Sequence, residues 1–350
     1  MISGEQDVLS HPFRSGLSII LNRPQSINSL SEAMIDRIDG LLSEAAADEQ
    51  CLYVLFYGSS PKGFCAGGDV KELARLGRLK EYGQLDSFFR KEYALDLRIH
   101  LFPKPVIVIA DGITMGGGLG IAAGADISIA TERTRMAMPE TRIGFFPDVG
   151  STGWMFTRCP KGYPEYLGLT GYDMTGSGCV RLGFARHYMK SGDLPRLIDM
   201  LEHEIPEAGQ GKQDLLKNLL EKISGFLDFN IPVNPAMDAW VERYFMGKSD
   251  IREILASLSQ CHEQQDHCNE VFASIAERSP SALVLTLKLL RLNEGRSIED
   301  VLATELKAAK FMTRHPDYIE GIRARLIDRD DMPKWNPDRI DLVDLSGFHP

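Results

Sequence analysis

The sequence predicts an α/β fold in which strands alternate with helices over the first half of the chain and helices dominate the second half. Two observations lead to this expectation. Short runs of β-branched and apolar residues alternate with helical patterns up to about residue 166, which is typical of strands that pair in parallel through crossover helices. Beyond that point strand-like runs become rare and amphipathic helical patterns follow one another.

The first half contains four strand-like segments. Residues 16–22 end at a proline, and a helical pattern at 31–46 follows them. A continuous apolar run at 51–57 has the length of a buried parallel strand. A second copy of this arrangement begins at 105–110 and turns into a glycine-rich helix start, and residues 126–130 form the last strand-like segment. We therefore expect stacked β-β-α units with largely parallel pairing.

The second half consists of amphipathic helical patterns. They cover residues 194–203, 214–226, 251–258, 262–277, 280–293 and 298–313. Pro280 stands where a proline at the first helical position belongs, and Ser279 precedes it as the N-cap. The polar stretch 207–213 is predicted to be a mobile loop. On this basis we divide the chain into a core at 1–200 and a mainly helical region at 201–350.

The composition excludes some partners. The chain has 350 residues, 43% of them hydrophobic and 25% charged, with a formal net charge of −10. Because this charge opposes phosphate backbones and no run of lysine and arginine interrupts it, we expect no nucleic-acid partner. No apolar run approaches the roughly 20 residues that a membrane span needs, so no membrane partner is expected. A few local cations and helix N-termini still allow an anionic small molecule to bind.

The cysteines and the N-terminus bear on the compartment. The six cysteines are scattered, at positions 51, 65, 159, 179, 261 and 268. Since they show neither CxxC pairs nor Cys/His metal spacing, we expect reduced thiols and no metal site. The first sixteen residues lack a basic and then apolar signal pattern. The expected compartment is the cytosol, or the mitochondrial matrix if a transit peptide has been removed.

Two glycine-rich segments could place backbone N–H groups against a ligand. In Lys-Gly-Phe-Cys-Ala-Gly-Gly-Asp at 62–69, Gly67 and Gly68 permit close approaches of the backbone that bulkier residues resist. In Gly-Ile-Thr-Met-Gly-Gly-Gly-Leu-Gly at 112–120, three glycines begin a helix and expose its positive end. Together the two segments could form an oxyanion hole. The alternative for the first is a plain strand-to-helix turn. For the second it is a dinucleotide-binding fingerprint at 118–123, which lacks its acidic partner about 20 residues on.

A third segment carries two carboxylates. Glu140 and Asp148 lie in the apolar loop Met-Pro-Glu-Thr-Arg-Ile-Gly-Phe-Phe-Pro-Asp-Val-Gly at 138–150. Desolvation there would raise a carboxyl pKa and hydrogen bonds would lower it, which suits acid–base or nucleophilic work. The alternative is a helix cap or a surface pair. The sequence contains no Gly-x-Ser-x-Gly, His-Glu-x-x-His or P-loop motif, so other hydrolase and nucleotide chemistries find no support.

These three segments, in this order and spacing, resemble the crotonase (enoyl-CoA hydratase/isomerase) superfamily, and the resemblance extends from about residue 16 to residue 335. It implies a spiral of β-β-α units with a helical C-terminal region that covers the acyl group. It also implies that the N–H groups of Gly68 and Gly117 hold the thioester oxygen of an acyl-CoA substrate. No cofactor is implied, because coenzyme A is part of the substrate. Superfamily members often form trimers, and the resemblance leaves the oligomeric state of this chain open.

One position separates branches of the superfamily. Hydratases carry a glutamate three residues after the middle glycine, where this chain has Gly120, and a second glutamate at the position of Glu140. The departure at Gly120 counts against hydration. The chain instead resembles the branch that hydrolyses β-hydroxyacyl-CoA thioesters such as 3-hydroxyisobutyryl-CoA, an intermediate of valine breakdown. The residues that match the functional positions of that branch are Glu92, Gly117, Glu140 and Asp148.

The resemblance implies roles for these residues. Glu140 attacks the thioester carbonyl as a nucleophile or activates water as a general base. Asp148 binds the β-hydroxyl and positions the water, and Glu92 shapes the same site. Two alternatives stay open: a hydratase or isomerase acting on another acyl-CoA, and a non-catalytic acyl-CoA-binding protein.

Further residues are assigned by position alone. Ala66 and Asp69 flank the expected substrate groove. Lys71 or Arg75 could meet the phosphates of coenzyme A, although lysines on a helix face are more often solvated. Trp154 is expected to restrict the length of the acyl group.

Overall fold

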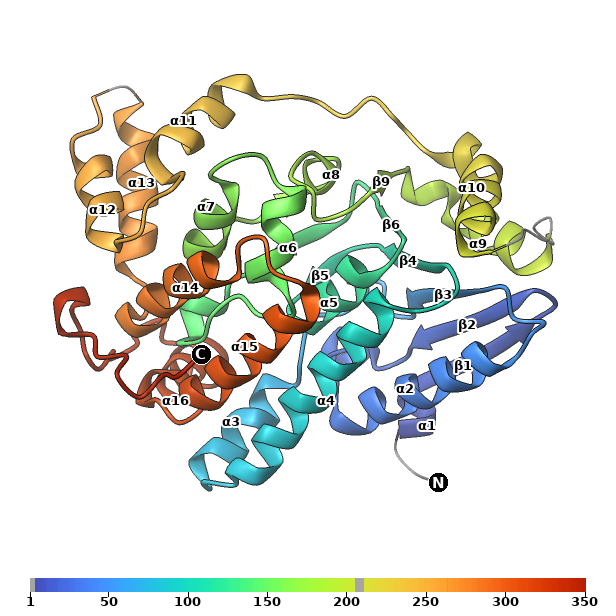
Figure 1. Cartoon of the computed structure of the whole chain (residues 1–350), viewed down its shortest axis with the longest axis horizontal. Coiled ribbons are helices and arrows are strands. Elements are labelled where there is room, and N and C mark those ends of the chain that lie inside the picture. The colour runs from blue at the N-terminus through green and yellow to red at the C-terminus, as the bar shows by residue number, and fades with distance from the viewer. Residues whose placement is uncertain (1–3, 205–210, 263) are drawn as a thin grey trace. The chain divides into compact units, whose positions relative to one another are not determined.

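The computed structural model describes residues 4–204, 211–262 and 264–350, and its strands and helices form an α/β architecture (Figure 1). The larger sheet has six strands in the order β1-β2-β3-β4-β6-β9. Its strands are β1 Val8–Phe13, β2 Gly16–Leu21, β3 Tyr53–Gly58, β4 Val106–Ala110, β6 Ile127–Ala130 and β9 His187–Tyr188. All neighbours from β2 to β9 pair in parallel, whereas β1 and β2 are antiparallel. The predicted parallel pairing is therefore confirmed.

A second, smaller sheet has the order β5-β7-β8. Its strands are β5 Ile113–Met115, β7 Arg135–Ala137 and β8 Met174–Thr175. The strand β5 leads directly into the glycine-rich helix start, so this sheet holds one of the predicted N–H segments.

The strand β1 was not predicted. It contains His11 and Pro12, and its residues alternate between buried and exposed only in part. A proline cannot donate to a strand ladder, and it is tolerated here because β1 is the edge strand of the sheet. The hairpin with β2, in which Phe13 pairs with Gly16, supplies the pairing that local composition did not reveal.

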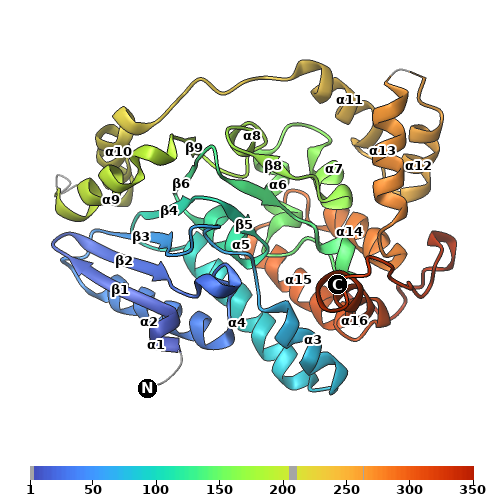
Figure 2. The same ribbon diagram turned by 180° about the vertical axis from the view of Figure 1, so that it is seen from behind.

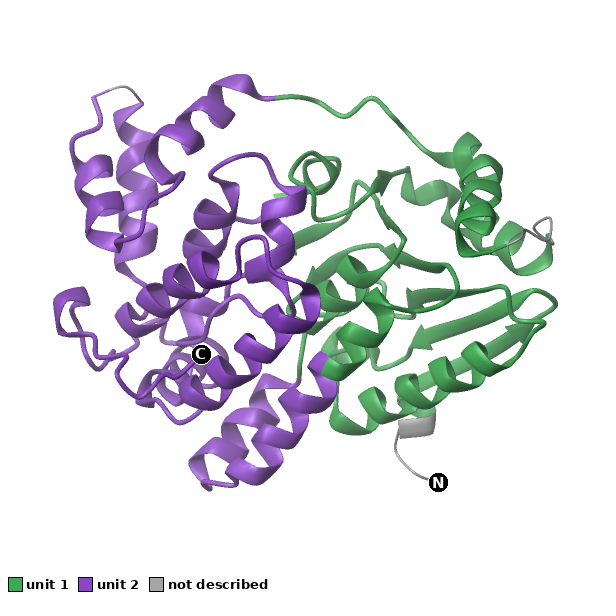
Figure 3. Ribbon diagram, in the orientation of Figure 1, with its two compact units in different colours: residues 1–68, 94–136, 174–233 green, residues 69–93, 137–173, 234–350 purple. Residues whose placement is uncertain are grey.

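The chain divides into two compact units, coloured separately in Figure 3. Unit 1 comprises residues 1–68, 94–136 and 174–233, and unit 2 comprises residues 69–93, 137–173 and 234–350. Each unit thus joins three separated stretches of chain, and both units cut across the predicted ranges 1–200 and 201–350.

Unit 1 contains the six-stranded sheet and the helices that cover it. The helices are α1 Gly4–Asp7, α2 Glu32–Ala47, α5 Gly117–Gly124, α8 Gly178–Arg181, α9 Leu194–His203 and α10 Lys212–Ile223. Side chains of α9 and α10 pack with Leu55, Ile107 and Ile129 of the sheet, and Figure 2 shows these helices from behind. The helix α2 begins at Ser31, whose hydroxyl accepts a hydrogen bond from the Met34 amide at 3.2 Å, close to the predicted start.

Unit 2 is mainly helical. Its helices are α3 Val70–Arg78, α6 Ser151–Arg158, α7 Tyr163–Thr170, α11 Pro235–Phe245, α12 Ile251–Ser259, α13 Gln265–Ala276, α14 Pro280–Asn293, α15 Ile298–Met312 and α16 Pro316–Ile322. A 3-10 turn, η2 Glu140–Ile143, and a π-helical turn, η5 Arg323–Ile327, also belong to it. The long helix α4 Tyr82–His100 begins in unit 2 and ends in unit 1.

The helical pattern of the second half was predicted well. The helices α9 and α14 have the predicted bounds, and the Ser279 hydroxyl caps α14 by accepting from the Ala282 amide at 3.1 Å. The helices α4 and α11 were missed. Residues 207–210 of the predicted mobile loop lie outside the described residues, whereas Lys212 already begins α10. In the described part of the chain, no helix is both long enough and apolar enough to cross a membrane.

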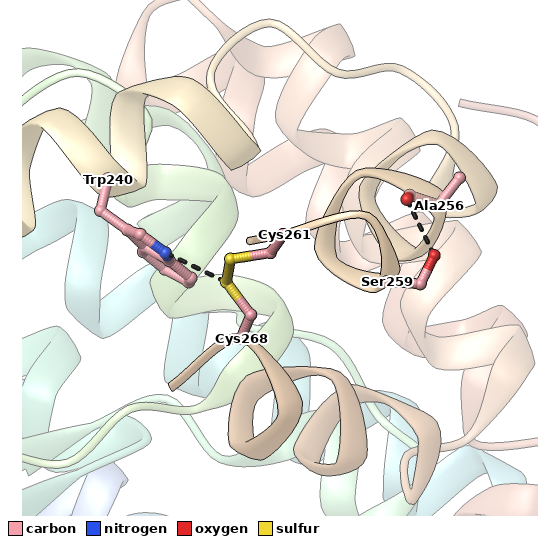
Figure 4. Close-up of a disulfide and its surroundings, with 5 residues drawn as sticks. All are labelled: Trp240, Ala256, Ser259, Cys261 and Cys268. Atoms are coloured by element: carbon pink, nitrogen blue, oxygen red, sulfur yellow. Dashed lines mark hydrogen bonds between the residues drawn. A yellow bond between two sulfur atoms is a disulfide. The ribbon is translucent and has the colours of Figure 1, made fainter. Parts of the chain in front are cut away.

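The prediction that all six cysteines are free thiols is wrong for two of them. Cys261 and Cys268 form a disulfide, and the indole N–H of Trp240 donates to the Cys268 sulfur at 3.4 Å (Figure 4). Cys261 follows the C-cap of α12 and Cys268 lies in the first turn of α13, with Cα atoms 6.4 Å apart. Because this proximity arises from the packing of two helices, a separation of 7 residues along the chain gave no sign of it. The other four cysteines form no disulfide.

Candidate active site

The loop that carries the two predicted carboxylates is tightly constrained. Glu140 begins the turn η2, and its carbonyl accepts a hydrogen bond from the Phe145 amide at 3.0 Å. Gly144 follows with a φ of +69°, and a Cβ there would lie 2.2 Å from the Asp317 carbonyl oxygen of α16. Only glycine fits this close approach, because a side chain would collide with the backbone of α16. Glycine at this position therefore lets α16 pack against η2 and allows the backbone to turn at the end of η2, before Asp148.

The backbone changes direction immediately after Asp148. Val149 and Gly150 both have left-handed conformations, with φ values of +53° and +80°. The Asp148 carbonyl accepts a hydrogen bond from the Ser151 amide at 2.9 Å, and α6 begins there. A β-branched residue at positive φ is uncommon and persists only when its surroundings hold it in place. One of its restraints is Trp154, whose indole N–H donates to the Val149 carbonyl at 3.2 Å.

Both carboxyl groups are buried. Glu140 is 8% exposed and Asp148 is 5% exposed. Burial raises the pKa of Glu140 well above its usual value, and the neighbouring charge of Asp148 raises it further. Burial also raises the pKa of Asp148, to about 7, although a hydrogen bond from Tyr93 acts in the opposite direction. Near neutral pH the pair therefore holds a proton that two exposed carboxyls would have lost, and Asp148 ionises first.

The helix α4 supplies two further groups. The hydroxyl of Tyr93 donates to Asp148 Oδ2 at 2.7 Å. Burial raises the pKa of Tyr93 well above its usual value, and the charges of Asp148, Glu305 and Glu92 add to this effect. Glu92 is buried, and its charge also acts on the hydroxyl of Tyr318. The structure therefore brings Glu92, Glu140 and Asp148 into one group of electrostatically linked side chains, and their roles in catalysis stay predictions.

Aromatic rings enclose this group. Phe145 stacks on Phe146 with ring centroids 4.5 Å apart and on Phe89 of α4 at 5.3 Å. Tyr318 of α16 lies 5.5 Å from the Phe145 ring, and Phe89 lies 5.9 Å from the Tyr93 ring. The rings replace water around the carboxyl groups, which is the physical cause of their raised pKa values.

Three members of the group were missed by sequence reasoning: Tyr93, Tyr318 and Glu305. Glu305 of α15 is fully buried, and it accepts hydrogen bonds from the amides of Gly150 and Thr152 at 2.6 and 3.2 Å. A signal for Glu305 did exist, because it is the one acidic residue among the buried positions of α15. Tyr93 directly follows Glu92 but reads as an ordinary apolar position of a helix.

The two glycine-rich segments lie against each other in unit 1. Cys65 bridges to Thr114 of β5, with the Cys65 amide donating to the Ile113 carbonyl at 3.1 Å. A Cβ on Gly67, which has a φ of +102°, would lie 3.6 Å from the Gly117 amide nitrogen. The structure thus places the two predicted N–H segments side by side.

The N–H groups of these segments are oriented by the surrounding backbone. Leu30 and Gly68 form a parallel β-bridge. In this bridge the Leu30 amide donates to the Gly67 carbonyl at 2.8 Å, and the Gly68 N–H is not used. Gly117 is the first residue of α5, where an N–H has no partner within the helix. An oxyanion hole would need both N–H groups to point at one ligand oxygen, and this role of Gly68 and Gly117 stays a prediction.

The predicted groove residues have local structural roles. The Ala66 amide donates to the Ile27 carbonyl at 2.9 Å, and the Asp69 side chain caps α3 by accepting from the Glu72 amide at 3.4 Å. Arg75 forms two hydrogen bonds with Glu72, at 2.7 and 2.8 Å, whereas Lys71 is exposed. The guanidinium of Arg75 is thus paired within its own helix. Contacts of these residues with coenzyme A stay predictions.

The space beside Gly120 is filled by a neighbouring side chain. A Cβ at this position of α5 would lie 2.6 Å from Oδ1 of Asp96, which is buried. The Asp96 carboxylate thus occupies the space that a residue-120 side chain would need. In the described ranges 4–204, 211–262 and 264–350, no group of three acidic, histidine or cysteine side chains has the arrangement to hold a metal ion.

Comparison with known proteins identifies the family. The sequence profile of the enoyl-CoA hydratase/isomerase family matches residues 17–348. The mitochondrial 3-hydroxyisobutyryl-CoA hydrolase of Gallus gallus is 35% identical over 330 residues, which cover 93% of this chain and 83% of that protein. The small ribosomal subunit protein mS47 of Neurospora crassa is 35% identical, over 97% of this chain and 69% of its own length.

A solved structure extends this likeness to the fold. The crystal structure of a carnitinyl-CoA dehydratase from Mycobacterium thermoresistibile matches with a TM-score of 0.88 and 29% identity, over 99% of this chain and 97% of the other. The chain therefore belongs to the enoyl-CoA hydratase/isomerase, or crotonase, family. Its predicted crotonase fold is confirmed.

Proposed function

We propose that this chain hydrolyses the thioester of a short β-hydroxyacyl-CoA, with 3-hydroxyisobutyryl-CoA as substrate and 3-hydroxyisobutyrate and coenzyme A as products. The observation that carries the proposal is the buried pair Glu140 and Asp148, whose pKa values are both raised and whose loop is constrained on both sides. A protein that only binds acyl-CoA has no use for two desolvated carboxyls. The relative from Gallus gallus carries the name of the proposed activity.

Hydrolysis is favoured over hydration by the absence of a second acid at position 120. Gly120 itself offers no proton donor, and the carboxylate of Asp96 would have to shift before a side chain could be added there. Adding water across a double bond needs one group to deliver the hydroxyl and one to deliver the proton. Cleaving a thioester needs a nucleophile, water and a stabilised oxyanion, which the pair of carboxyls and the glycine amides could supply.

In the proposed first step, the N–H groups of Gly68 and Gly117 polarise the thioester carbonyl. The ionised carboxylate of Glu140 attacks the carbonyl carbon, the carbon–sulfur bond breaks, and the thiolate of coenzyme A leaves and is protonated. Water then cleaves the resulting mixed anhydride, which releases the acid and restores Glu140. In the alternative form of the mechanism, Glu140 removes a proton from a water molecule that attacks the thioester directly.

Asp148 has a different role in this proposal. It binds the β-hydroxyl of the acyl group and positions the attacking water, while Glu92 shapes the same site. A hydroxyl donates a stronger hydrogen bond to an ionised carboxylate than to a neutral acceptor. Since Asp148 is the member of the pair that ionises first, it is the better acceptor for that hydroxyl near neutral pH.

The proposed substrate also determines which other ligands we expect. Coenzyme A enters as part of the thioester, and we propose no additional cofactor, metal, nucleic acid or membrane partner. Ala66 and Asp69 are proposed to flank the coenzyme, and the oligomeric state stays open. The name of the relative from Gallus gallus includes the mitochondrion, which favours the mitochondrial matrix over the cytosol for this chain.

The test is the release of free thiol from 3-hydroxyisobutyryl-CoA, with crotonyl-CoA beside it, by wild type, Glu140→Gln and Asp148→Asn. We expect wild type to act on the hydroxyacyl substrate, with kcat about 10²–10⁴-fold lower in each variant. The exposed residue Glu253 supplies the control variant Glu253→Gln, which should match wild type. Because both carboxyls must be ionised and Asp148 ionises first, kcat/KM should rise with pH from about 7 and keep rising as Glu140 loses its proton.

Two other outcomes would reject the proposal. Hydration of crotonyl-CoA without thiol release would show a hydratase, and the acid that replaces the missing residue at position 120 would then lie elsewhere. Binding of acyl-CoA with no turnover of any substrate would show a binding protein. The second outcome has a structural precedent to consider, because the relative from Neurospora crassa is named as a ribosomal protein.

A further inference from the structure

The residue Glu305 joins the C-terminal helix α15 to the loop that carries Asp148. Its Oε2 accepts a hydrogen bond from the Gly150 amide at 2.6 Å. Its Oε1 accepts from the amide and the hydroxyl of Thr152, at 3.2 and 2.5 Å. These contacts span more than 150 positions of sequence, and all of them lie within unit 2. Glu305 therefore fastens the loop at the point where it turns from Asp148 into α6.

This arrangement completes the N-terminus of α6. The N-cap position of α6 is Gly150, which has no side chain to accept a hydrogen bond from the first turn. The carboxylate of Glu305 accepts these N–H groups instead and places a negative charge at the positive end of the helix, which is its favoured location. A Cβ on Gly150 would lie 2.6 Å from Ile298 of α15. The glycine thus permits the close packing that brings Glu305 within reach.

The direction of the hydrogen bond between the Thr152 hydroxyl and Glu305 follows from the side-chain amide of Asn293. Asn293 of α14 donates from Nδ2 to the Thr152 hydroxyl oxygen at 2.8 Å. The hydroxyl oxygen is thus already an acceptor, and its proton points to Glu305. All three partners of Glu305 are donors, which is the pattern that suits an ionised carboxylate.

Few other charges act on Glu305. Burial raises the pKa of Glu305 to about 8, the Thr152 and Gly150 hydrogen bonds act in the opposite direction, and the charge of Asp148 raises it. From α4, Tyr93 faces it as a neutral phenol, and from α14 only the amide of Asn293 does. Lys307, the nearest cation in sequence, is exposed, and Arg296 is engaged with Asn293, Thr304 and Asp300.

We propose that Glu305 is a positioning residue for the reaction: by holding the turn from Asp148 to Thr152, it fixes the direction of the Asp148 carboxylate. The inference rests on the proposed function, because it concerns the same carboxyl pair. It gives the helix α15 a part in catalysis although none of its residues contacts the substrate in the proposed mechanism.

The experiment compares wild type with Glu305→Gln, Glu305→Asp and the control Glu299→Gln in the thiol-release assay. Glu299 is exposed on the same helix, so its variant should match wild type. In Glu305→Gln an amide N–H₂ faces the donors of Gly150 or Thr152, and the turn loses one anchor. We expect kcat to fall up to about a hundredfold, as a displaced catalytic group implies, while KM changes by less than about threefold because Glu305 does not touch the substrate.

The pH profile and the Glu305→Asp variant separate positioning from a merely structural role. Because the pKa of Asp148 is raised to about 7 and that of Glu305 to about 8, Glu305 is still neutral while Asp148 ionises. The acidic limb of kcat/KM in Glu305→Gln should therefore stay close to that of wild type while kcat falls. Glu305→Asp keeps a carboxyl group that is one methylene shorter, so it should retain more of the wild-type kcat than Glu305→Gln.

The outcomes distinguish this inference from the proposed function. If wild type releases no thiol, the proposed function fails before Glu305 is tested. If wild type is active and folded Glu305→Gln has the same kcat, Glu305 has no positioning role. If Glu305→Gln does not fold, Thr152→Val decides, since it removes only the hydroxyl donor. An unchanged kcat in folded Thr152→Val would then overturn the inference, and a smaller loss of kcat would support it.

Discussion

The two groups of candidate residues, one in each unit, differ in the kind of chemistry proposed for them. In unit 1 the proposed groups are backbone N–H groups, those of Gly68 and Gly117, and the glycines around them keep side chains out. A Cβ on Gly118, for example, would lie 2.5 Å from the Cys65 carbonyl oxygen. In unit 2 the side chains of Glu140 and Asp148 supply it, and burial among aromatic rings sets their ionisation.

This difference predicts opposite sensitivities. Substitutions that add side-chain atoms to the glycine-rich segments should lower activity, because two stretches of backbone lie in contact there. In the cluster around Glu140 and Asp148, substitutions that remove polar atoms or charges should lower activity, because each side chain depends on its neighbours for its orientation and pKa. The predictions below test each side of this comparison.

The largest effect is expected for Gly67→Ala. Its φ of +102° strains any residue with a Cβ, and that Cβ would lie 3.2 Å from the Met115 carbonyl oxygen. The strained turn should shift the Gly68 N–H, and loss of one oxyanion donor lowers kcat by about 10²–10³-fold. We expect thermal stability to fall as well, since alanine at positive φ is unfavourable.

The matched control is Gly40→Ala in the helix α2, where a Cβ would have no heavy atom within 4 Å. That variant should keep wild-type kcat and gain up to about 1 kcal/mol of stability from helix propensity. Equal kcat values for Gly67→Ala and wild type would show that the amide segment does not hold the thioester oxygen.

A smaller effect, on stability, is expected for Gly120→Ala. Its Cβ would meet the Asp96 carboxylate at 2.6 Å, and overpacking of this kind costs about 1–3 kcal/mol. Asp96→Ala removes the obstructing carboxylate, so the cost of Gly120→Ala should be smaller in that background. Chemical denaturation of the wild type, the two single variants and the double variant measures this coupling. Purely additive free energies would mean that Asp96 does not limit position 120.

The sequence predicted the parts of the site that are contiguous along the chain. Gly68, Gly117, Glu140 and Asp148 lie in short motifs whose composition departs from that of ordinary strands and helices, so they could be chosen as candidates without coordinates, and their chemical roles stay predictions. Glu92 was found only through the resemblance to a family. The predicted strands β2, β3, β4 and β6 were likewise local features with continuous apolar runs.

The remaining parts arise from tertiary packing, and local patterns could not reveal them. Tyr93 and Glu305 reach the loop from α4 and α15, so their roles depend on which helix faces pack together. The disulfide between Cys261 and Cys268 depends on the packing of α12 and α13 in the same way. The edge strand β1 is stabilised by its pairing with β2 rather than by its own composition.

The smallest effect on the rate is expected for Tyr93→Phe, and the direction in which its pH profile moves tests the account of unit 2. This variant removes one hydrogen bond to Asp148, of 2.7 Å, without changing the ring or any charge. Because that bond lowers the pKa of Asp148, its loss should raise the pKa and move the acidic limb of kcat/KM to higher pH. Near neutral pH the rate should fall about tenfold, the equivalent of roughly 1.4 kcal/mol.

The control for this variant is Tyr172→Phe, because Tyr172 is 45% exposed and lies outside the carboxyl group. The acidic limb of Glu305→Gln should stay close to that of wild type, although both variants act on the same loop. A general loosening of the loop would move both limbs the same way. A shift in Tyr93→Phe without one in Glu305→Gln would therefore show that the hydrogen bond from Tyr93 sets the ionisation of Asp148, whereas equal shifts would refute this account of unit 2.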